Sequence, residues 1–318
     1  MHLTGPPPQP PPVPGALAAV PCRDGVVSLA LLRRAGVSSA TVHRAVAEGS
    51  AWRPAPGALA VGAPPEDHRV ESRLRVLGQL VTRPDHCATR ASALELLGLP
   101  LLGRSRTVQL GSARHRTARP RRGLELHPHP TAPVLVVPPG CTHEWPVSPL
   151  ARALAEYAMH PGTGVERALV PMDAALHAGR TTLEDVAAVA RPGLRNVAVL
   201  RRALELADPL CESPGETRTR LALVQGGLTP RSQVTVQTPR GRYRLDLLVE
   251  ELRVALEFDG AVKYDGASGR QALVAEKVRE DALREMGLGI VRVTWPDLHG
   301  PDAPLRLCAR VRAAAPRP

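Results

Sequence analysis

Apolar residues recur at helical and strand spacing near the N-terminus, and the pattern predicts a compact module. Two short helices are predicted on either side of Gly36, with Ser28 capping the first and Ser38 or Ser39 the second. Two short strands around a Pro/Gly turn follow, in residues 52–61. Residues 18–64 therefore predict a helix-turn-helix with a wing.

The pattern over residues 67–208 predicts a mixed region. We expect one helix over 88–97, strands at 107–110, 124–127 and 134–137, and three helical segments over about 148–208. The apolar stripe of the second segment is core, and Asp173 beside it is structural. This region predicts no chemistry.

From residue 210 to 312 the predicted order changes to helix, three strands, helix and strand. Ser213 and Glu216 are spaced as a capping box at the start of the first helix. Apolar residues alternate on the second and third strands, and matching them pairs Leu245 with Phe258, Leu247 with Leu256 and Val249 with Val254.

That register places Asp246 opposite Glu257, and Arg244 opposite Asp259, on the other face of the sheet. Directly opposed β-carbons lie only about 4.5–5.5 Å apart, so two carboxylates there repel unless a cation lies between them. Mg²⁺ is one candidate cation. The alternative is that the acids decorate a wet sheet face, with Arg244 relieving their charge. Glu216 is placed to supply a third carboxylate, and Gly260 allows a close backbone approach.

The charge of the chain favours a polyanionic partner. Its net charge is +11, and two of its 41 basic residues, Lys263 and Lys277, are lysines. DNA is the simplest partner, and a basic surface without a specific ligand is the alternative. The predicted DNA contacts are the polar residues on the exposed side of the second helix and one arginine of the wing: Ser39, Thr41, His43, Arg44 and Arg53. A helix-turn-helix that serves only as a packing module is the other interpretation.

Five arginines gather in residues 114–122, where they either hold phosphates or form a solvated hairpin loop. Five scattered cysteines without a CxxC pair indicate reduced thiols and exclude a typical structural zinc site. No apolar run is long enough to span a membrane. The start of the chain lacks the features of a signal peptide, and residues 1–17 form a Pro-rich tail that we expect to be disordered. We therefore predict a cytoplasmic protein.

The C-terminal residues carry a family resemblance. Asp246, Glu257-Phe-Asp-Gly260, Lys263, the stretch Glu276–Leu283, Gly287 and Val291–Leu298 resemble the endonuclease-like domains related to very-short-patch-repair endonucleases, of the PD-(D/E)xK superfamily. The N-terminal part, from Gly25-Val-Val-Ser28 through Gly57–Val61, resembles the winged helix-turn-helix of AbiEi-type antitoxins from type IV toxin–antitoxin systems.

The resemblance implies a restriction-endonuclease-like fold in which Asp246 and Glu257 bind Mg²⁺ and Glu216 assists from the helix. The sequence departs from the family pattern at Asp259, where a lysine is expected two residues after Glu257. Lys263 or Lys277 then supplies the catalytic lysine from a neighbouring segment. Arg279 is either an accessory site residue or a surface residue, and Lys277 is spaced for a helical ion pair with Asp281.

The sequence thus predicts a multidomain α+β protein: a winged helix-turn-helix, a mixed middle region and a C-terminal α/β domain. The first functional hypothesis is a Mg²⁺-dependent DNA endonuclease. The second is a DNA-binding regulator of antitoxin type with an inactive nuclease-like domain, for which the resemblance adds a cognate toxin as partner. The sequence does not set the oligomeric state.

Overall fold

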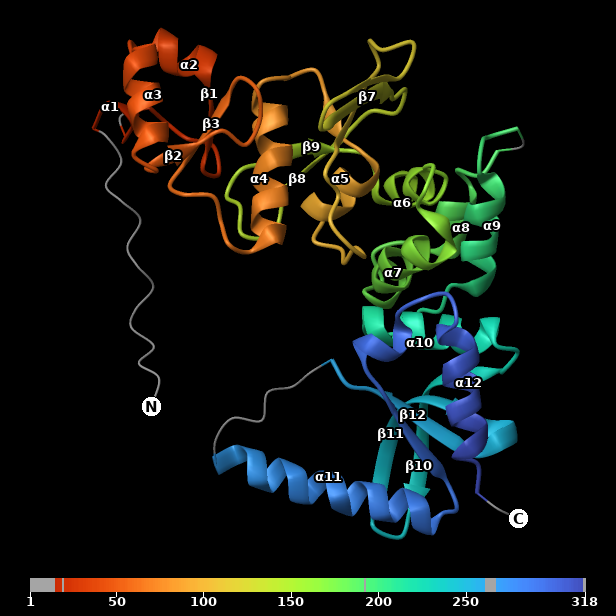
Figure 1. The fold of residues 1–318 in the computed structure, drawn as a ribbon. Helices are drawn as coiled ribbons and strands as arrows, with labels where there is room; N and C mark the ends of the chain where they lie inside the picture. Colours follow the sequence, from red (N-terminus) through yellow and green to blue (C-terminus); the bar gives the residue numbers. More distant parts are fainter. Residues whose placement is uncertain (1–14, 19, 192, 261–266, 317–318) are drawn as a thin grey trace. The chain divides into compact units, whose positions relative to one another are not determined.

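The computed structural model describes residues 15–316 except 19, 192 and 261–266 (Figure 1). The protein is a mixed α+β structure with three separate β-sheets in the described part. It divides into two compact units, Met1–His160 and Pro161–Pro318, and the division falls inside the predicted middle region 67–208. No helix in the described residues has the length and apolarity needed to cross a membrane.

The N-terminal module, residues 15–62, is built from short elements with the predicted caps. They are α1 (Gly15–Ala18), β1 (Val26–Ser28), α2 (Leu29–Arg34), α3 (Ser39–Ala47), β2 (Ala51–Trp52) and β3 (Ala58–Val61). Ser28 Oγ accepts from the amide of Leu31 at 3.1 Å, and Ser38 Oγ accepts from the amide of Thr41 at 3.1 Å. Strand β1, which the sequence pattern did not predict, completes a sheet of order β1-β3-β2.

The rest of the first unit is a six-stranded sheet with helices packed on it. Its elements are α4 (His68–Val81), β4 (Cys87–Ala88), α5 (Arg90–Leu96), β5 (Val108–Ser112), β6 (Arg119–Arg121), β7 (Leu124–Pro128), β8 (Val134–Val136), β9 (Trp145–Val147) and α6 (Leu150–Ala158). The sheet order is β6-β7-β5-β4-β9-β8. Helix α4 was not predicted. The arginine-rich segment joins β5 to β7, which are parallel, and only β6 forms a hairpin with β7.

In the second unit, a helical layer precedes a four-stranded sheet along the chain. The helices are α7 (Gly164–His177), α8 (Leu183–Ala187) and α9 (Val197–Leu206). The sheet and its helices are α10 (Pro214–Gln225), β10 (Pro230–Thr238), β11 (Gly241–Val249), η1 (Glu250–Leu252), β12 (Val254–Phe258), α11 (Ala267–Glu285), β13 (Gly289–Val293), η2 (Trp295–Leu298) and α12 (Ala303–Ala313). Because α6 lies in the first unit, the predicted three helical segments are four helices divided between the two units.

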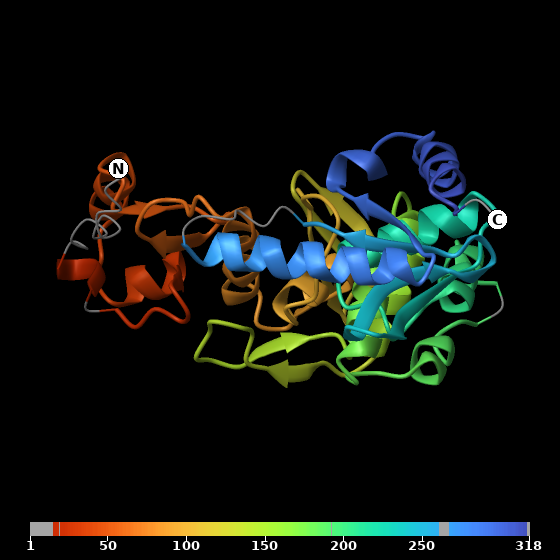
Figure 2. The same cartoon turned by 90° about the horizontal axis from the view of Figure 1, so that it is seen from below.

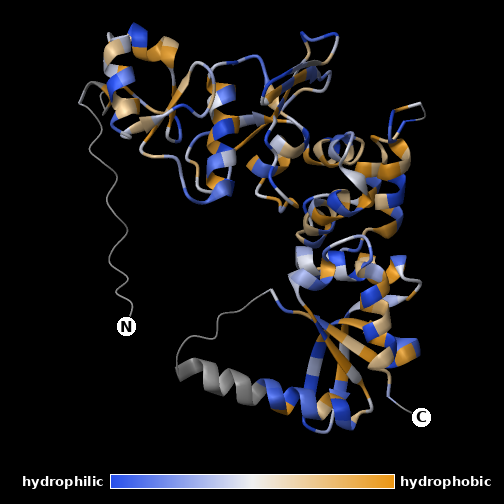
Figure 3. Cartoon of the chain, in the orientation of Figure 1, coloured by the Kyte–Doolittle hydropathy of each residue, from blue (hydrophilic) through white to orange (hydrophobic). Residues whose placement is uncertain are grey.

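The sheet of the second unit has the order β10-β11-β12-β13, with only β12 and β13 parallel. The predicted register is confirmed for Leu247 with Leu256 and for Val249 with Val254. These four residues belong to one core cluster with residues of α10, β13 and α12. Strands β12 and β13 are accordingly apolar over most of their length (Figure 3). The C-terminal part of α11 lies along the other face, where Leu283 joins a second cluster with Leu248 and Ala255 (Figure 2).

A buried charge network joins α7 to α10. The carboxylate of Asp173, 1% exposed, accepts from the Asp208 amide at 2.9 Å and from Thr217 Oγ1 at 2.9 Å. The guanidinium of Arg220 also donates to it, at 3.3 Å. Burial raises the pKa of Asp173 to about 6, while these donors act against that rise. The expectation that Asp173 is structural is confirmed.

Asp173→Ala should destabilise the protein strongly, because it leaves the Arg220 guanidinium buried without its main carboxylate. Removing one partner of a buried pair costs about 3–5 kcal/mol. The free energy of unfolding, measured by denaturant titration, checks this. The matched control is Glu205→Ala, which breaks an exposed ion pair with Arg202 and should cost no more than about 1 kcal/mol. Equal losses in the two variants would contradict a structural role for Asp173.

Candidate functional site

The acidic residues of β11 and β12 lie where the pairing of these strands stops. The ladder ends at Leu247–Leu256, one position before Asp246 and Glu257. In place of the predicted Leu245–Phe258 pairing, the Phe258 amide donates to Oδ2 of Asp246 at 3.0 Å. The Asp246 carboxylate thus replaces a backbone acceptor, so the strands separate at this end of the sheet.

Glu257 is paired with an arginine of α11. Arg279 lies 2.5 Å from Glu257 Oε1 and also donates to the Arg244 carbonyl at 2.6 Å. The Glu257 side chain is 16% exposed and that of Arg279 25%. Burial raises the pKa of Glu257; Arg279 opposes the rise, and the charges of Glu276 and Asp246 add to it. The arginine that relieves the acidic charge is therefore Arg279, and the predicted partner Arg244 binds Glu212 instead, at 2.8 Å.

Glu216 is held within the cap of its own helix. Its Oε1 accepts from Ser213 Oγ at 2.8 Å, and its Oε2 accepts from the Glu212 amide at 3.0 Å and from Gln233 Nε2 at 2.8 Å. The residue is only 7% exposed, and burial raises its pKa, with the charge of Asp246 adding to the rise. The charge of Asp246 therefore raises the pKa of both Glu216 and Glu257.

Gln233 is a component of this site that the sequence pattern did not reveal. It lies on β10 with φ of +54°, between the pairs Ser232–Leu247 and Val234–Leu245, and so faces the position of Asp246. A non-glycine residue at positive φ is strained. In this conformation its side-chain amide donates to Glu216. The alternating pattern of β10 gave no signal for it, because backbone dihedrals are not encoded in that pattern.

Among the remaining predicted site residues, the structure describes Asp259 and Lys277. The Asp259 amide donates to the Val293 carbonyl at 2.8 Å, just beyond β12. Lys277 is exposed on α11, and in the described helix it forms no ion pair with Asp281, so that predicted pair is wrong. Lys263 falls outside the described residues.

The family resemblance implies a Mg²⁺ ion at the acidic end of the sheet, which consists of Asp246, Glu257 and Glu216. Within the part of the chain that the structure describes, no three His, Cys, Asp or Glu side chains are grouped to hold a metal ion. The glutamate oxygens already have partners in the protein. Those of Glu216 accept hydrogen bonds, and Oε1 of Glu257 is paired with a guanidinium. As they lie in this structure, the described side chains do not fit a magnesium ion.

The N-terminal module carries a second cluster of predicted site residues. Ser39, His43 and Arg53 line one small groove of about 190 Å³ together with Arg33 and apolar side chains of α2 and α3. Thr41 is turned toward the helix start, where its hydroxyl lies 2.9 Å from Ser38 Oγ. The predicted residue Arg44 is exposed but does not line the groove.

The arginine-rich segment 114–122 lies on the surface of the first unit. Arg114 pairs with Asp85 at 2.7 Å, and both side chains are more than half exposed. Arg116, Arg121 and Arg122 are exposed as well. Exposed arginines at the edge of a sheet are available to polyanions and to solvent alike.

No protein-family model matches the chain. Two proteins of Mycobacterium tuberculosis, Uncharacterized protein MT2308 (strain CDC 1551 / Oshkosh) and Uncharacterized protein Rv2248 (strain ATCC 25618 / H37Rv), are each 31% identical to it over 150 residues. The match covers 46% of this chain and 53% of each relative, so the chain spans about half the length of the curated relatives it matches. The crystal structure of the RV2827C protein from M. tuberculosis has a TM-score of 0.38 at 15% identity, covering 65% of this chain and 78% of that chain. These distant similarities assign no family.

The effect of Asp246 on the pKa of both glutamates gives a prediction. Asp246→Asn removes one negative charge but keeps an oxygen acceptor for the Phe258 amide, so the pKa values of both Glu216 and Glu257 should fall. A raised carboxyl pKa in the folded state lowers stability as pH rises through it, so this loss of stability should shrink in the variant. Carboxyl ¹³C NMR titration measures both pKa values. Asp281→Asn is the charge-matched control, and unchanged pKa values in Asp246→Asn would show that the three groups are independent.

Proposed function

We propose that the chain is a DNA-binding protein that contacts duplex DNA through a winged helix-turn-helix in its N-terminal module. The observation that carries the proposal is the groove formed by Ser39, His43 and Arg53. Two of these residues lie on α3, and Arg53 follows strand β2 of the wing. The second helix of such a pair commonly lies in the DNA major groove, with polar side chains directed to the bases.

The burial of α3 supports this role. Val42 and Ala45 are buried, whereas Ser39, His43 and Arg44 on the remaining surface are exposed. A helix that served only to pack within the protein would not need cationic residues on its free side. A net charge of +11 favours association with the phosphate backbone, to which the exposed arginines of segment 114–122 are suited.

The C-terminal domain, in this proposal, has the element order of the endonuclease-like family but not its chemistry. The order of helix, three antiparallel strands, helix and parallel strand supports the resemblance. The pairing of Glu257 with Arg279 favours a domain that contributes contacts rather than cleavage. The chain is then a regulator of antitoxin type in the cytoplasm, with a cognate toxin as a further proposed partner, and its five free cysteines suit a reducing compartment.

A Mg²⁺-dependent endonuclease is the second candidate function. The specific observation in its favour is that the charge of Asp246 raises the pKa of both Glu216 and Glu257, as expected for carboxylates gathered at one site. The observation against it is that, among the described residues, no three His, Cys, Asp or Glu side chains are grouped to hold a metal ion. Cleavage would require the Glu257 carboxylate to be released from Arg279 and a lysine to reach it.

Removing the two arginines at the N-terminal groove should weaken DNA binding without changing the fold, because both side chains are exposed. In the double variant Arg33→Ala, Arg53→Ala, the slope of log affinity against log salt should fall by about 1 for each phosphate that the variant no longer neutralises. Fluorescence anisotropy with a short duplex at several salt concentrations measures it. The variant Arg201→Ala, Arg202→Ala removes the same charge from α9 and is the control. Equal slopes in the two variants would remove the groove from the DNA interface.

A plasmid-cleavage assay distinguishes the two candidate functions. With supercoiled plasmid and Mg²⁺, we expect wild-type protein to retain duplex and to nick it no faster than the variant Asp246→Asn, Glu257→Gln. Gel electrophoresis of the plasmid over time gives the rate. Nicking by wild type that both substitutions abolish, with DNA retention unchanged, would establish the endonuclease instead.

A further inference from the structure

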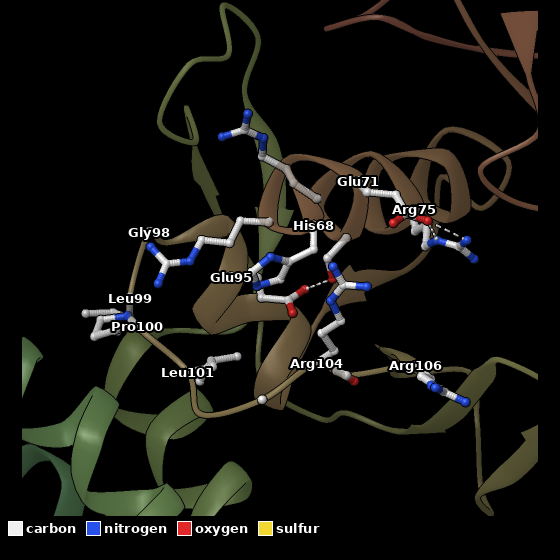
Figure 4. A pocket seen from close by; sticks show the side chains of 15 residues that line it. His68, Glu71, Arg75, Glu95, Gly98, Leu99, Pro100, Leu101, Arg104 and Arg106 are labelled. Carbon is white, nitrogen blue, oxygen red and sulfur yellow. Dashed lines mark hydrogen bonds and ion pairs between the residues drawn. The ribbon is translucent and has the colours of Figure 1, made fainter. Parts of the chain in front are cut away.

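The first unit contains a pocket that neither the DNA groove nor the acidic site uses. It has a volume of about 510 Å³ and lies between the first half of α4, Glu95 of α5 and the segment 98–106 (Figure 4). Ligand pockets for small molecules typically measure about 300–1,000 Å³, so this one has the size for a nucleotide.

Arginines dominate the charge of the pocket. Five of them line it, against two carboxylates, Glu71 and Glu95. Their formal balance is +5 − 2 = +3. The arginines are Arg69, Arg73, Arg75, Arg104 and Arg106.

The five arginines differ in what they bind. Arg75 is paired with Glu71 at 2.7 Å, and Arg73 donates to the carbonyl of Pro139. Among the described residues, Arg69, Arg104 and Arg106 form no ion pair and no side-chain hydrogen bond. Three exposed guanidinium groups around one pocket are suited to phosphate, which accepts bidentate hydrogen bonds from arginine.

The remaining lining combines an apolar wall with polar side chains, among them Glu95 and Ser72. Leu99 is buried, and Pro100 and Leu101 continue the same wall. Glu95 lines the pocket from α5, and one of its carboxyl oxygens accepts from Ser72 Oγ at 2.9 Å. Burial raises the pKa of Glu95 to about 7, so near neutral pH a large fraction of this carboxyl carries a proton that it can donate. A flat heteroaromatic base offers an apolar face and hydrogen-bonding edges to such a lining.

From this lining we infer that the pocket binds a nucleotide, with the base against Leu99–Leu101 and the phosphate held by Arg69, Arg104 and Arg106. The same chemistry is presented by a free nucleotide and by one nucleotide of a single strand. The inference is independent of the proposed function, because the DNA groove of α3 shares no residue with this pocket.

Isothermal titration calorimetry on the full chain tests the inference with the four deoxynucleoside monophosphates, their nucleosides, inorganic phosphate and a short single-stranded oligonucleotide. Binding of a monophosphate tighter than its nucleoside and tighter than phosphate supports a free-nucleotide site. Binding of the oligonucleotide alone, abolished by substitution in the pocket, assigns the site to a strand. Binding of phosphate equal to that of the nucleotides, or no binding by any probe, overturns the inference.

The variant Arg104→Ala, Arg106→Ala should lower the affinity for the monophosphate or oligonucleotide that wild-type protein binds by at least about tenfold. The reason is that hydrogen bonds to charged groups are stronger than those between neutral groups. Both residues are exposed on a connecting segment, and an unchanged thermal unfolding profile verifies the fold. Arg201→Ala, Arg202→Ala controls for net charge. Retention of affinity in the pocket variant would overturn the assignment even if wild-type protein binds nucleotides. Loss of nucleotide binding with intact duplex binding would leave the proposed DNA-binding function standing.

Discussion

The ion pair between Glu257 and Arg279 decides what the acidic end of the C-terminal sheet is able to do. A buried carboxylate must be neutralised, by a proton, a metal ion or a cationic side chain. Here a guanidinium on α11 does so, at 2.5 Å. The same guanidinium holds the Arg244 carbonyl, so α11 is fastened to the sheet by the group that occupies the site. Any cation that bound Glu257 would therefore compete with Arg279 for one carboxylate.

The acidic end is supported from its other side by α10. The carboxylate of Glu216 accepts hydrogen bonds from the cap residue Ser213 and from Gln233 on β10, so it stabilises the local structure. The position of α10 in turn depends on Asp173 of α7, which binds Thr217 and Arg220. A chain of buried polar contacts thus runs from the helical layer of the second unit to its sheet. A buried polar group of such a network that lacks a hydrogen-bond partner destabilises the fold. The residues of this network therefore stabilise the folded structure.

The arginines of this protein differ in whether they have an acidic partner. Many of its arginines neutralise neighbouring acids, as Arg75 does for Glu71 and Arg292 for Glu276. Those of the 98–106 segment do not, although Glu95 lies in the same pocket. An arginine without an acidic partner is available to a negatively charged ligand. The groove of α3 and the pocket beside α4 are the two places in the first unit where we propose that such ligands bind.

Local signals in the sequence predicted the caps, most of the helices and strands, and part of the site. Ser28, Ser38 and Ser213 accept the amide hydrogen bonds expected of caps, because a cap depends on residues three positions apart. The alternating apolar residues fixed the register of β11 and β12, because a slip would expose them.

The tertiary structure alone decided the parallel pairing of β5 with β7, the reach of Arg279 to Glu257 and the pocket closed by segment 98–106. Each of these brings together residues from different elements. A local pattern of apolar residues does not reveal such contacts, because they depend on the path of the backbone between the elements. The sequence by itself determined the helix caps and the register of β11 with β12. Folding determined which charges meet, because Coulomb interactions depend on distances that only the packed chain sets.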